Sequence, residues 1–362
     1  MNRCSVCVMP DTRPDVPFID GVCAACVTYQ SRPTVDWEAR KRMLVDLLDR
    51  FHGECIVPSS GGKDSTYQVM TLLGMGAHVT VVTATTCHLT EIGRKNIDNL
   101  ARHARTIEYS PNKTVRAKLN RLGLELVGDI SWPEHSAIFT TPFKASHQLG
   151  IPLIFYGENP QNQYGGPQGS EEAMQMTRRW RSEFGGFLGL RPDDVVGKLG
   201  ITDRDMDDYR LTHKDGGGQE AHFLGQYLPW DSHENARVAM EAGMQAKLPC
   251  PENWWHWENL DNAQTGLHDY FGYLKYGYGR GCAQISADVR TGRVDRSYAL
   301  QWARKNNGAF PPSKYAGVRW EDAVSRIGLT TEQCGALMDR FTNWDLFVAG
   351  KFGPVLKATD AG

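Results

Sequence analysis

The stretch PSSGGKDST, residues 58–66, follows the apolar run 55–57 and precedes the helix-like segment YQVMTLLGMGA. Two adjacent glycines between a strand and a helix let consecutive backbone N–H groups converge on an anion, and the following helix adds its positive end. The spacing differs from that of a Walker A loop, G-x-x-x-x-G-K-[ST]. It therefore predicts a phosphate-binding turn of another kind, with an ordinary turn as the alternative.

The side chains of this turn suggest separate roles. Hydroxyl groups can add donors to the backbone N–H groups, whereas Asp64 has the wrong sign for a phosphate. We expect Asp64 to reach Mg²⁺ or to organise the loop. The predicted cradle consists of Ser60, Gly61, Gly62, Lys63, Asp64, Ser65 and Thr66.

Strand-like and helix-like segments alternate after residue 55. This pattern predicts a doubly wound parallel α/β sheet covered on both faces, with ligands at the carboxyl ends of its strands. The expected strands are 55–58, 78–85, 106–110, 151–159 and 220–230, and the expected helices are 36–51, 64–76, 90–104, 136–150 and 231–244.

The chain divides into three predicted parts. Residues 1–36 form a cysteine-containing module, residues 37–290 form the α/β domain, and residues 291–362 form a helical C-terminal region. A glycine-rich, aperiodic insertion at about 161–218 is a candidate lid.

The formal net charge of −2, from 40 Lys and Arg against 42 Asp and Glu, argues against a nucleic-acid partner. No apolar run is long enough for a membrane span, so we expect a cytoplasmic protein without a membrane partner.

The four cysteines of the N-terminal module have the spacing C-x2-C-x15-C-x2-C. Two such thiolate pairs can close a tetrahedral site, which predicts a structural Zn²⁺ ion. Four reduced thiols or an iron–sulfur cluster are the alternatives. The predicted ligands are Cys4, Cys7, Cys23 and Cys26.

The motif S-G-G-x-D-S after a strand resembles the signature of PP-loop ATP pyrophosphatases. Over residues 4 to about 300 the chain looks like the N-acetyl sugar amidotransferase family. The segments that carry this resemblance are CSVCVMPDTRP, GVCAAC, DWEAR, CIVPSSGGKDSTYQV, TEIGRKNIDNL, DISWPEH, IPLIFYGENPQNQYGG and FGYLKYGYGRG. Two positions depart from the family pattern. Gly281-Cys282-Ala283 stand where Ala-Thr-Asp is usual, and Gln163 stands where Glu is frequent, which could alter substrate choice.

The resemblance implies a fold of the adenine nucleotide α-hydrolase type and an ATP- and Mg²⁺-dependent reaction. AMP is transferred to the oxygen of an acetamido group on a sugar nucleotide, pyrophosphate leaves, and ammonia then expels AMP to give an acetamidino group. A diacetamido-uronic acid on UDP and a nonulosonic acid on CMP are both possible substrates, from surface polysaccharide or nonulosonic acid synthesis. Ammonia is expected from a separate HisH/HisF-like glutaminase–synthase pair or from solution, since no cysteine of this chain has a nucleophile signature.

The resemblance also suggests roles for individual residues. Lys63, Lys275 and Arg280 are candidates for neutralising pyrophosphate, although a solvated surface role remains open for each. The ordinary nucleotide geometry of the fold would bring Thr83 and Ala84 to adenine. Residues implied at the nucleotide or Mg²⁺ are Gly157, Glu158 and Asn159, and residues implied at the sugar nucleotide are Trp132, Glu134, His135, Tyr164, Gly165 and Gly166. For Trp132 packing is an equally good interpretation, and for Glu158 a capping role is the alternative.

Two other functions remain open at the level of the sequence. Some PP-loop enzymes thiolate RNA and also carry N-terminal zinc ligands, and Cys87, Cys250 and Cys282 could meet around a cluster. The absence of a basic, aromatic surface signature argues against this alternative. A non-catalytic scaffold that holds a nucleotide is the other possibility.

Overall fold

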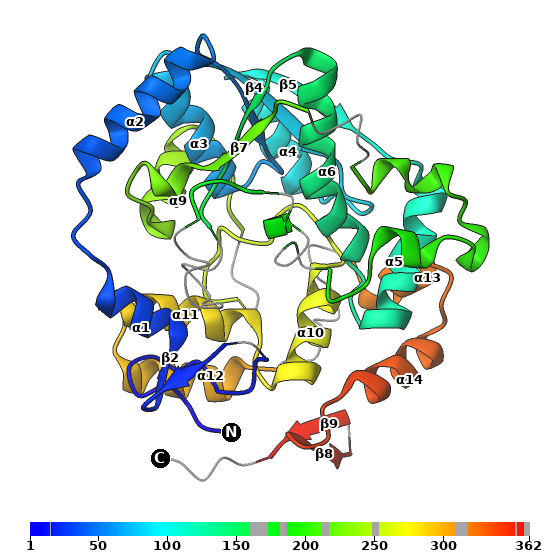
Figure 1. Cartoon of the computed structure of the whole chain (residues 1–362). Coiled ribbons are helices and arrows are strands. Elements are labelled where there is room, and N and C mark those ends of the chain that lie inside the picture. Colours follow the sequence, from blue (N-terminus) through cyan, green and yellow to red (C-terminus); the bar gives the residue numbers. More distant parts are fainter. Residues whose placement is uncertain are drawn as a thin grey trace.

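The computed structural model describes residues 1–14, 16–159, 173–177, 179–181, 185, 187–211, 217–247, 253–308, 318–351 and 353–357. Its centre is a five-stranded parallel sheet in the order β5-β4-β3-β6-β7 (Figure 1). The strands are β3 (Glu54–Pro58), β4 (His78–Ala84), β5 (Arg105–Tyr109), β6 (Leu153–Tyr156) and β7 (Glu220–Phe223). This sheet confirms the predicted α/β class.

Helices cover both faces of the sheet. Its strands are apolar at consecutive positions, and successive side chains point to opposite faces, so both faces must be buried. On β3, Cys55 and Val57 pack with Leu44 and other residues of one cluster, whereas Ile56 packs with Phe143 on the opposite face. The flanking helices are α2 (Trp37–Arg50), α3 (Lys63–Gly74), α4 (Glu91–Leu100), α5 (Lys113–Val127), α6 (Trp132–Leu149) and α9 (Ser232–Glu241). The strand order reverses beside β3, and a crevice at such a point is the usual ligand site of this architecture.

Helix α5 was not among the helices expected from the sequence. Its N-terminus is capped by Asn112, whose side chain accepts hydrogen bonds from the N–H groups of Thr114 and Val115, and it ends at Gly128 with φ of 61°. Both are ordinary helix signals. Helix α6 begins at Trp132 rather than at residue 136, because Pro133 is well tolerated in the first turn.

The insertion expected at about 161–218 is described only in part. Its residues 187–211 contain three short 3-10 helices, and they pack against α5 and α6 through Val195, Met206 and Tyr209. These helices are η2 (Pro192–Val195), η3 (Lys198–Gly200) and η4 (Arg204–Asp208), and a fourth, η5 (Leu224–Gln226), follows β7. The described part of the insertion is therefore a packed wall beside the sheet.

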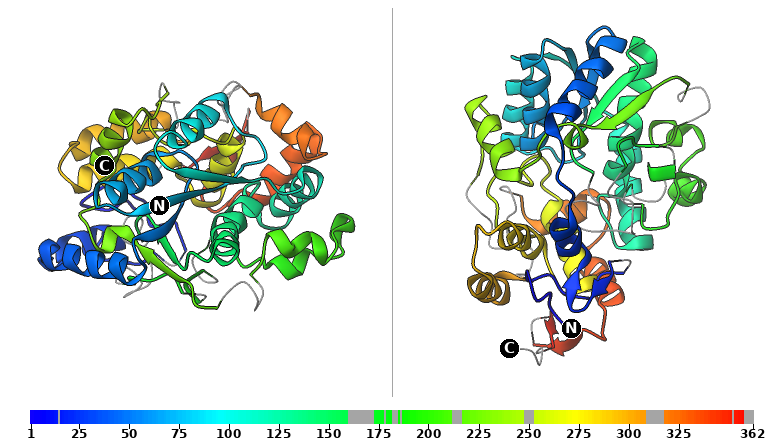
Figure 2. Two further views of the ribbon diagram at one scale, coloured as in Figure 1. Left: turned by 90° about the horizontal axis from the view of Figure 1, so that it is seen from above. Right: turned by 60° about the vertical axis from the view of Figure 1, so that its left-hand side comes forward.

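The N-terminal module and the last described C-terminal elements lie on the side of the molecule away from the sheet (Figures 1 and 2). A small hairpin, β1 (Phe18–Ile19) and β2 (Val22–Cys23), and helix α1 (Ala24–Ser31) form the N-terminal module. Arg296 joins it to the C-terminal helices by donating to the carbonyl oxygens of Cys4 and Cys7 at 2.8 and 3.0 Å. The C-terminal elements are α10 (Thr265–Tyr276), α11 (Arg280–Arg290), α12 (Arg296–Asn306), α13 (Trp320–Arg326), α14 (Thr331–Phe341), β8 (Phe347–Gly350) and β9 (Gly353–Leu356).

None of the helices in the described ranges combines the length and the apolar character that a membrane crossing requires.

Candidate active site

The glycine turn between β3 and α3 has the shape that the sequence predicts. Gly61 adopts φ of +80°, and a Cβ atom there would lie 2.8 Å from the backbone of Asn96 and Ile97 in α4. Only glycine fits without displacing α4. Ser59, which the sequence analysis did not single out, closes the turn: its Oγ accepts from Gly61 N at 2.9 Å and bonds Ser65 Oγ at 2.8 Å.

A cavity of about 530 Å³ opens at the carboxyl ends of the strands, directly in front of this turn. Its two walls come from distant parts of the chain. The sheet side includes Ser60, Gly62, Lys63, Asp64, Ser65, Ala84, Gly157 and Glu158, and the C-terminal side includes Trp257, Glu258, Asn259, Asp261 and Arg280. The cavity therefore brings many of the predicted site residues together.

Lys63 lies at the junction of the two walls. Its side chain is 4% exposed, and its Nζ lies 2.5 Å from Asp64 Oδ2 and 3.0 Å from Glu258 Oε1. Burial disfavours the charged amine, but Asp64 and Glu258 outweigh burial and hold the pKa of Lys63 well above its usual range. The solvated surface role considered for Lys63 is thus wrong. Asn235 of α9 fixes the other oxygen of Asp64, donating to Oδ1 at 2.9 Å.

Several carboxyl groups share this part of the cavity with Lys63. Burial, followed by the charge of Asp64, raises the pKa of Glu158 to about 8 despite the attraction of Lys63. Burial likewise raises the pKa of Asp261 to about 6. Carboxylate oxygens are the ligands that Mg²⁺ prefers, and a cation among these groups would relieve their mutual repulsion. Asp64, Glu158 and Glu258 therefore offer ligands of the kind that Mg²⁺ takes.

The remaining residues predicted at the nucleotide divide into two groups. Ala84 and Gly157 line the cavity, whereas Thr83 and Asn159 are buried next to lining residues. Within the described residues, Thr66 Oγ1 and Thr83 Oγ1 are buried and have no hydrogen-bond partner. Buried hydroxyls without partners are uncommon, and these two stand in the first turn of α3 and at the end of β4, beside the cavity.

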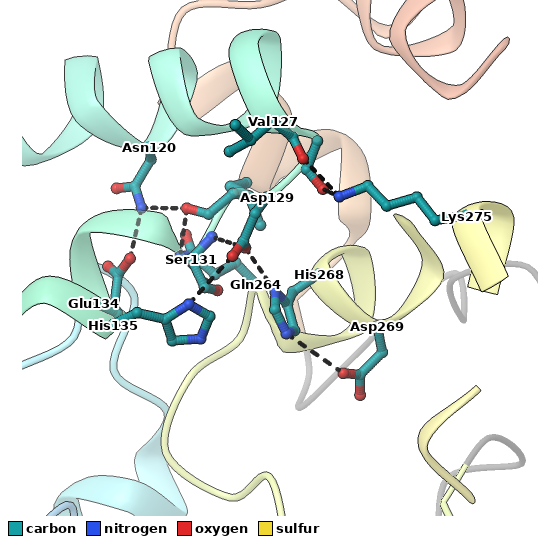
Figure 3. A network of polar contacts seen from close by, with 12 residues as sticks. Asn120, Val127, Asp129, Ser131, Glu134, His135, Gln264, His268, Asp269 and Lys275 are labelled. Carbon is teal, nitrogen blue, oxygen red and sulfur yellow. Dashed lines mark hydrogen bonds and ion pairs between the residues drawn. The ribbon is translucent and has the colours of Figure 1, made fainter. Parts of the chain in front are cut away.

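Three of the residues predicted at the sugar, Trp132, Glu134 and His135, are among the described residues, and of these three only Glu134 lines the cavity. It is held by Arg116 Nη1 at 3.2 Å and Asn120 Nδ2 at 2.8 Å, and Arg116 also lines the cavity although the sequence did not suggest it. Trp132 is fully buried and donates from Nε1 to Leu190 O at 3.2 Å, which agrees with its packing interpretation. His135 contacts Asp129 outside the lining (Figure 3). Tyr164, Gly165 and Gly166 lie outside the described residues.

Lys275 and Arg280, the other two basic residues predicted near pyrophosphate, lie in different environments. Arg280, at the start of α11, lines the cavity and pairs with Asp269, with Nη2 at 2.8 Å from Oδ1. Lys275 is not a lining residue. Its Nζ donates to the carbonyl oxygens of Val127 and Gly128 at 2.6 and 3.0 Å, where it caps the C-terminus of α5 (Figure 3).

The N-terminal cysteines form a compact group. The four sulfur atoms of Cys4, Cys7, Cys23 and Cys26 lie within 4.8 Å of one another, and all four residues are buried. Backbone N–H groups of Cys7 and Cys23 point at Cys4 Sγ, at 3.4 and 3.3 Å. Four converging sulfurs supported by N–H donors fit a closed tetrahedral zinc site.

Comparisons with known proteins add to this geometry. The family described as "LPS biosynthesis protein WbpG-like, C-terminal domain" matches residues 252–357. No curated protein matches the chain. The solved structure of NMN synthetase from Francisella tularensis aligns with 60% of this chain and 99% of its own, at 14% identity and a TM-score of 0.27, too low to carry an argument. The family match agrees with the resemblance to N-acetyl sugar amidotransferases, and the matched residues 252–357 include Glu258 and Arg280, which line the cavity.

Proposed function

We propose that the protein is an ATP-dependent amidotransferase that converts an acetamido group of a nucleotide-activated sugar into an acetamidino group. One observation carries this proposal: the glycine turn, which we predict to bind phosphate, and the segment that matches a WbpG-like C-terminal domain line the same cavity. The turn supports the use of a nucleotide, and the family supports a sugar substrate from lipopolysaccharide synthesis.

The proposed reaction has two steps, activation of the acetamido oxygen and attack by ammonia. The acetamido oxygen bonds to the α-phosphorus of ATP, and the bond from that phosphorus to the pyrophosphate oxygen breaks. Ammonia then bonds to the activated carbon, loses protons, and expels AMP, which carries the former acetamido oxygen away. The activation is needed because amide resonance makes an acetamido carbon a poor electrophile, and AMP is a far better leaving group than oxide.

The residues of the cavity suit the first step by position and charge. Lys63 and Arg280 are cations that could stabilise the negative charge of departing pyrophosphate, and each is already oriented by a carboxylate. Asp64, Glu158 and Glu258 would hold Mg²⁺, which when bound shields the phosphate charges. The turn at Gly61 would bind the β and γ phosphates through its backbone N–H groups.

The second step needs ammonia, and we propose that it comes from a separate glutaminase–synthase pair. The cysteines of the described residues support this view, because they have other contacts. Cys87 donates to Gln264 Oε1 at 3.0 Å, and Cys282 is buried beneath the N-terminal module beside Arg3. Burial raises the pKa of both thiols, which makes them poor nucleophiles at neutral pH.

The test uses the full-length protein with ATP, Mg²⁺, ammonium and acetamido sugar nucleotides labelled with ¹⁸O in the acetamido carbonyl. The panel contains a UDP-linked diacetamido-uronic acid and a CMP-linked nonulosonic acid. We expect AMP and pyrophosphate in equal amounts, ¹⁸O in the AMP, and a sugar product in which NH replaces one oxygen. The Asp64→Asn variant is the matched control, since it keeps the shape of the side chain and removes its charge.

Each other outcome argues against the proposal. Release of ADP, or of AMP without the label, would rule out activation of the acetamido oxygen. No AMP with any sugar, even with a glutaminase partner supplied, would favour an RNA thiolase or a scaffold. Iron and labile sulfide in anaerobically purified protein would then separate these two.

A further inference from the structure

A second group of potential metal ligands lies beside the cavity. Asp129 stands in the turn between α5 and α6, His135 in the first turns of α6, and His268 in α10 (Figure 3). His268 Nδ1 is 2.7 Å from Asp129 Oδ1, and His135 Nδ1 is 3.2 Å from Asp129 Oδ2. All three ligand atoms lie within 4.8 Å of one another. Two imidazoles thus converge on one carboxylate from three different elements.

The carboxylate at the centre of this group is buried and held by the backbone. Asp129 is 3% exposed, and its Oδ1 also accepts a hydrogen bond from Ser131 N at 2.8 Å. Carboxylate oxygens and neutral imidazole nitrogens are both ordinary zinc ligands. Asp129 therefore offers a positioned oxygen to an ion bound by the two histidines.

The spacing is close to what a small divalent ion requires. Ligands about 2.0–2.2 Å from a tetrahedral Zn²⁺ lie about 3.3–3.6 Å apart. His135 Nδ1 lies 3.2 Å from Asp129 Oδ2, and His268 Nδ1 lies 2.7 Å from the other oxygen, Oδ1. Since one ligand atom from each residue already lies within 4.8 Å of the others, shifts of about half an ångström to one ångström would place all three around one ion. The side chains of His135 and His268 are 29% and 24% exposed, which leaves a route for an ion.

The chemistry of the ligands selects the kind of ion. Imidazole nitrogen suits zinc and similar transition metals, whereas Mg²⁺ prefers oxygen ligands alone. Lys275 donates to carbonyl groups in the turn that precedes Asp129, and its positive charge would weaken the site. We therefore expect weaker binding here than at the four cysteines.

We propose that Asp129, His135 and His268 form a second Zn²⁺ site, separate from the four-cysteine site. Three protein ligands leave one coordination position for water or for a bound molecule, as in zinc sites that take part in binding or catalysis. The site adjoins the cavity on two sides. Glu134, which precedes His135, lines the cavity, and Asp269, which follows His268, pairs with the lining residue Arg280.

The first test counts zinc in the full-length protein after equilibrium dialysis against buffered, micromolar free Zn²⁺. We expect two zinc ions per chain in the wild type and one in the His268→Gln variant. Glutamine can still donate a hydrogen bond to Asp129 but is a poor zinc ligand, so this variant separates metal binding from hydrogen bonding. His103→Ala is the matched control and should keep two ions, because His103 is exposed and its Nε2 contacts the carbonyl oxygen of Ala242 at 3.0 Å, away from both proposed sites.

A second measurement assigns the lost ion to its site. Co²⁺ bound by thiolates gives intense sulfur-to-metal absorption, whereas Co²⁺ bound by imidazole and carboxylate does not. We expect His135→Ala and His268→Gln to lose the weaker bands and to keep the thiolate absorption. Circular dichroism checks that both variants are folded.

Two results would overturn the proposal. One zinc per chain in the wild type would leave Asp129 as a hydrogen-bond acceptor for two histidines. Two zinc ions retained in His268→Gln would place the second ion elsewhere. Neither measurement depends on the amidotransferase reaction, so the second site can fail while the proposed function stands, and the reverse.

Discussion

The two walls of the cavity are built in different ways. The sheet wall consists of a glycine turn and strand ends, and its shape follows from short-range rules such as the positive φ of Gly61 and the start of α3 at Lys63. The C-terminal wall consists of side chains such as Glu258 and Arg280, which reach the cavity from an irregular segment and from the start of α11. A motif is enough to predict the first wall, whereas the second depends on long-range packing.

The largest effect is expected on the sheet wall. Asp64→Asn should lower AMP formation about 1,000-fold, because it removes a charge from the predicted Mg²⁺ ligands while keeping the side-chain shape. Initial rates at saturating ATP measure this effect. Asp98→Asn, an exposed position in α4, is the control. Activity close to that of the wild type in Asp64→Asn would remove Asp64 from the catalytic machinery.

A matched pair of basic residues tests the C-terminal wall. Arg280→Met should lower turnover about 100-fold, since Arg280 lines the cavity and could face departing pyrophosphate. Lys275→Met should leave turnover unchanged and cost about 1 kcal/mol of stability, because Lys275 caps α5. The readouts are kcat and urea unfolding. Equal losses of activity in both variants would restore the prediction that Lys275 acts on pyrophosphate.

The contact between the walls can be broken at Glu258. Glu258→Gln removes one of the two ion-pair partners of the buried Lys63 and leaves Asp64, so we expect a loss of about 3 kcal/mol in the free energy of unfolding. The double variant Lys63→Met/Glu258→Gln should recover much of that stability, since it removes the poorly compensated charge. Urea denaturation of both variants provides the measurement. A double variant that is less stable than the single one would show that the ion pair itself stabilises the fold.

A smaller effect concerns pH. Because the pKa of Glu158 rises from its ordinary 4.5 to about 8 in the folded protein, the folded state holds this proton more tightly than the unfolded state. The contribution of Glu158 to stability is therefore present below pH 4.5 and falls as the pH rises through 8. Thermal unfolding without Mg²⁺ should show this decline, and Glu158→Gln should flatten it.

Addition of Mg²⁺ should reverse the decline, because the ion binds the deprotonated carboxylate. The stabilisation by Mg²⁺ should thus increase between pH 6 and pH 8 in the wild type and much less in Glu158→Gln. A Mg²⁺ effect independent of pH in the wild type would remove Glu158 from the proposed ligands.

The parallel sheet and its glycine turn could be predicted from the sequence alone. Alternation of strands and helices is a local pattern, and glycine at position 61 is required wherever a turn packs this close to a neighbouring helix. The grouping of the four cysteines could also be predicted from their spacing, because two closely spaced pairs have few other uses in a chain of this composition. Ser59 and helix α5 were missed although ordinary turn and capping signals mark both.

Long-range packing, by contrast, selects the charged residues that share the cavity. Lys275 and Arg280 stand five positions apart in one motif, yet one caps α5 and the other lines the cavity, because Gly277 ends α10 with φ of 72° and turns the chain toward α11. Glu258 and Arg116 belong to no motif that we recognised in the sequence. The structure identifies them through their ion pairs, Glu258 with Lys63 and Arg116 with Glu134. The same holds for Asp129, His135 and His268, since the distance between side chains from separate helices is set by packing and not by spacing along the chain.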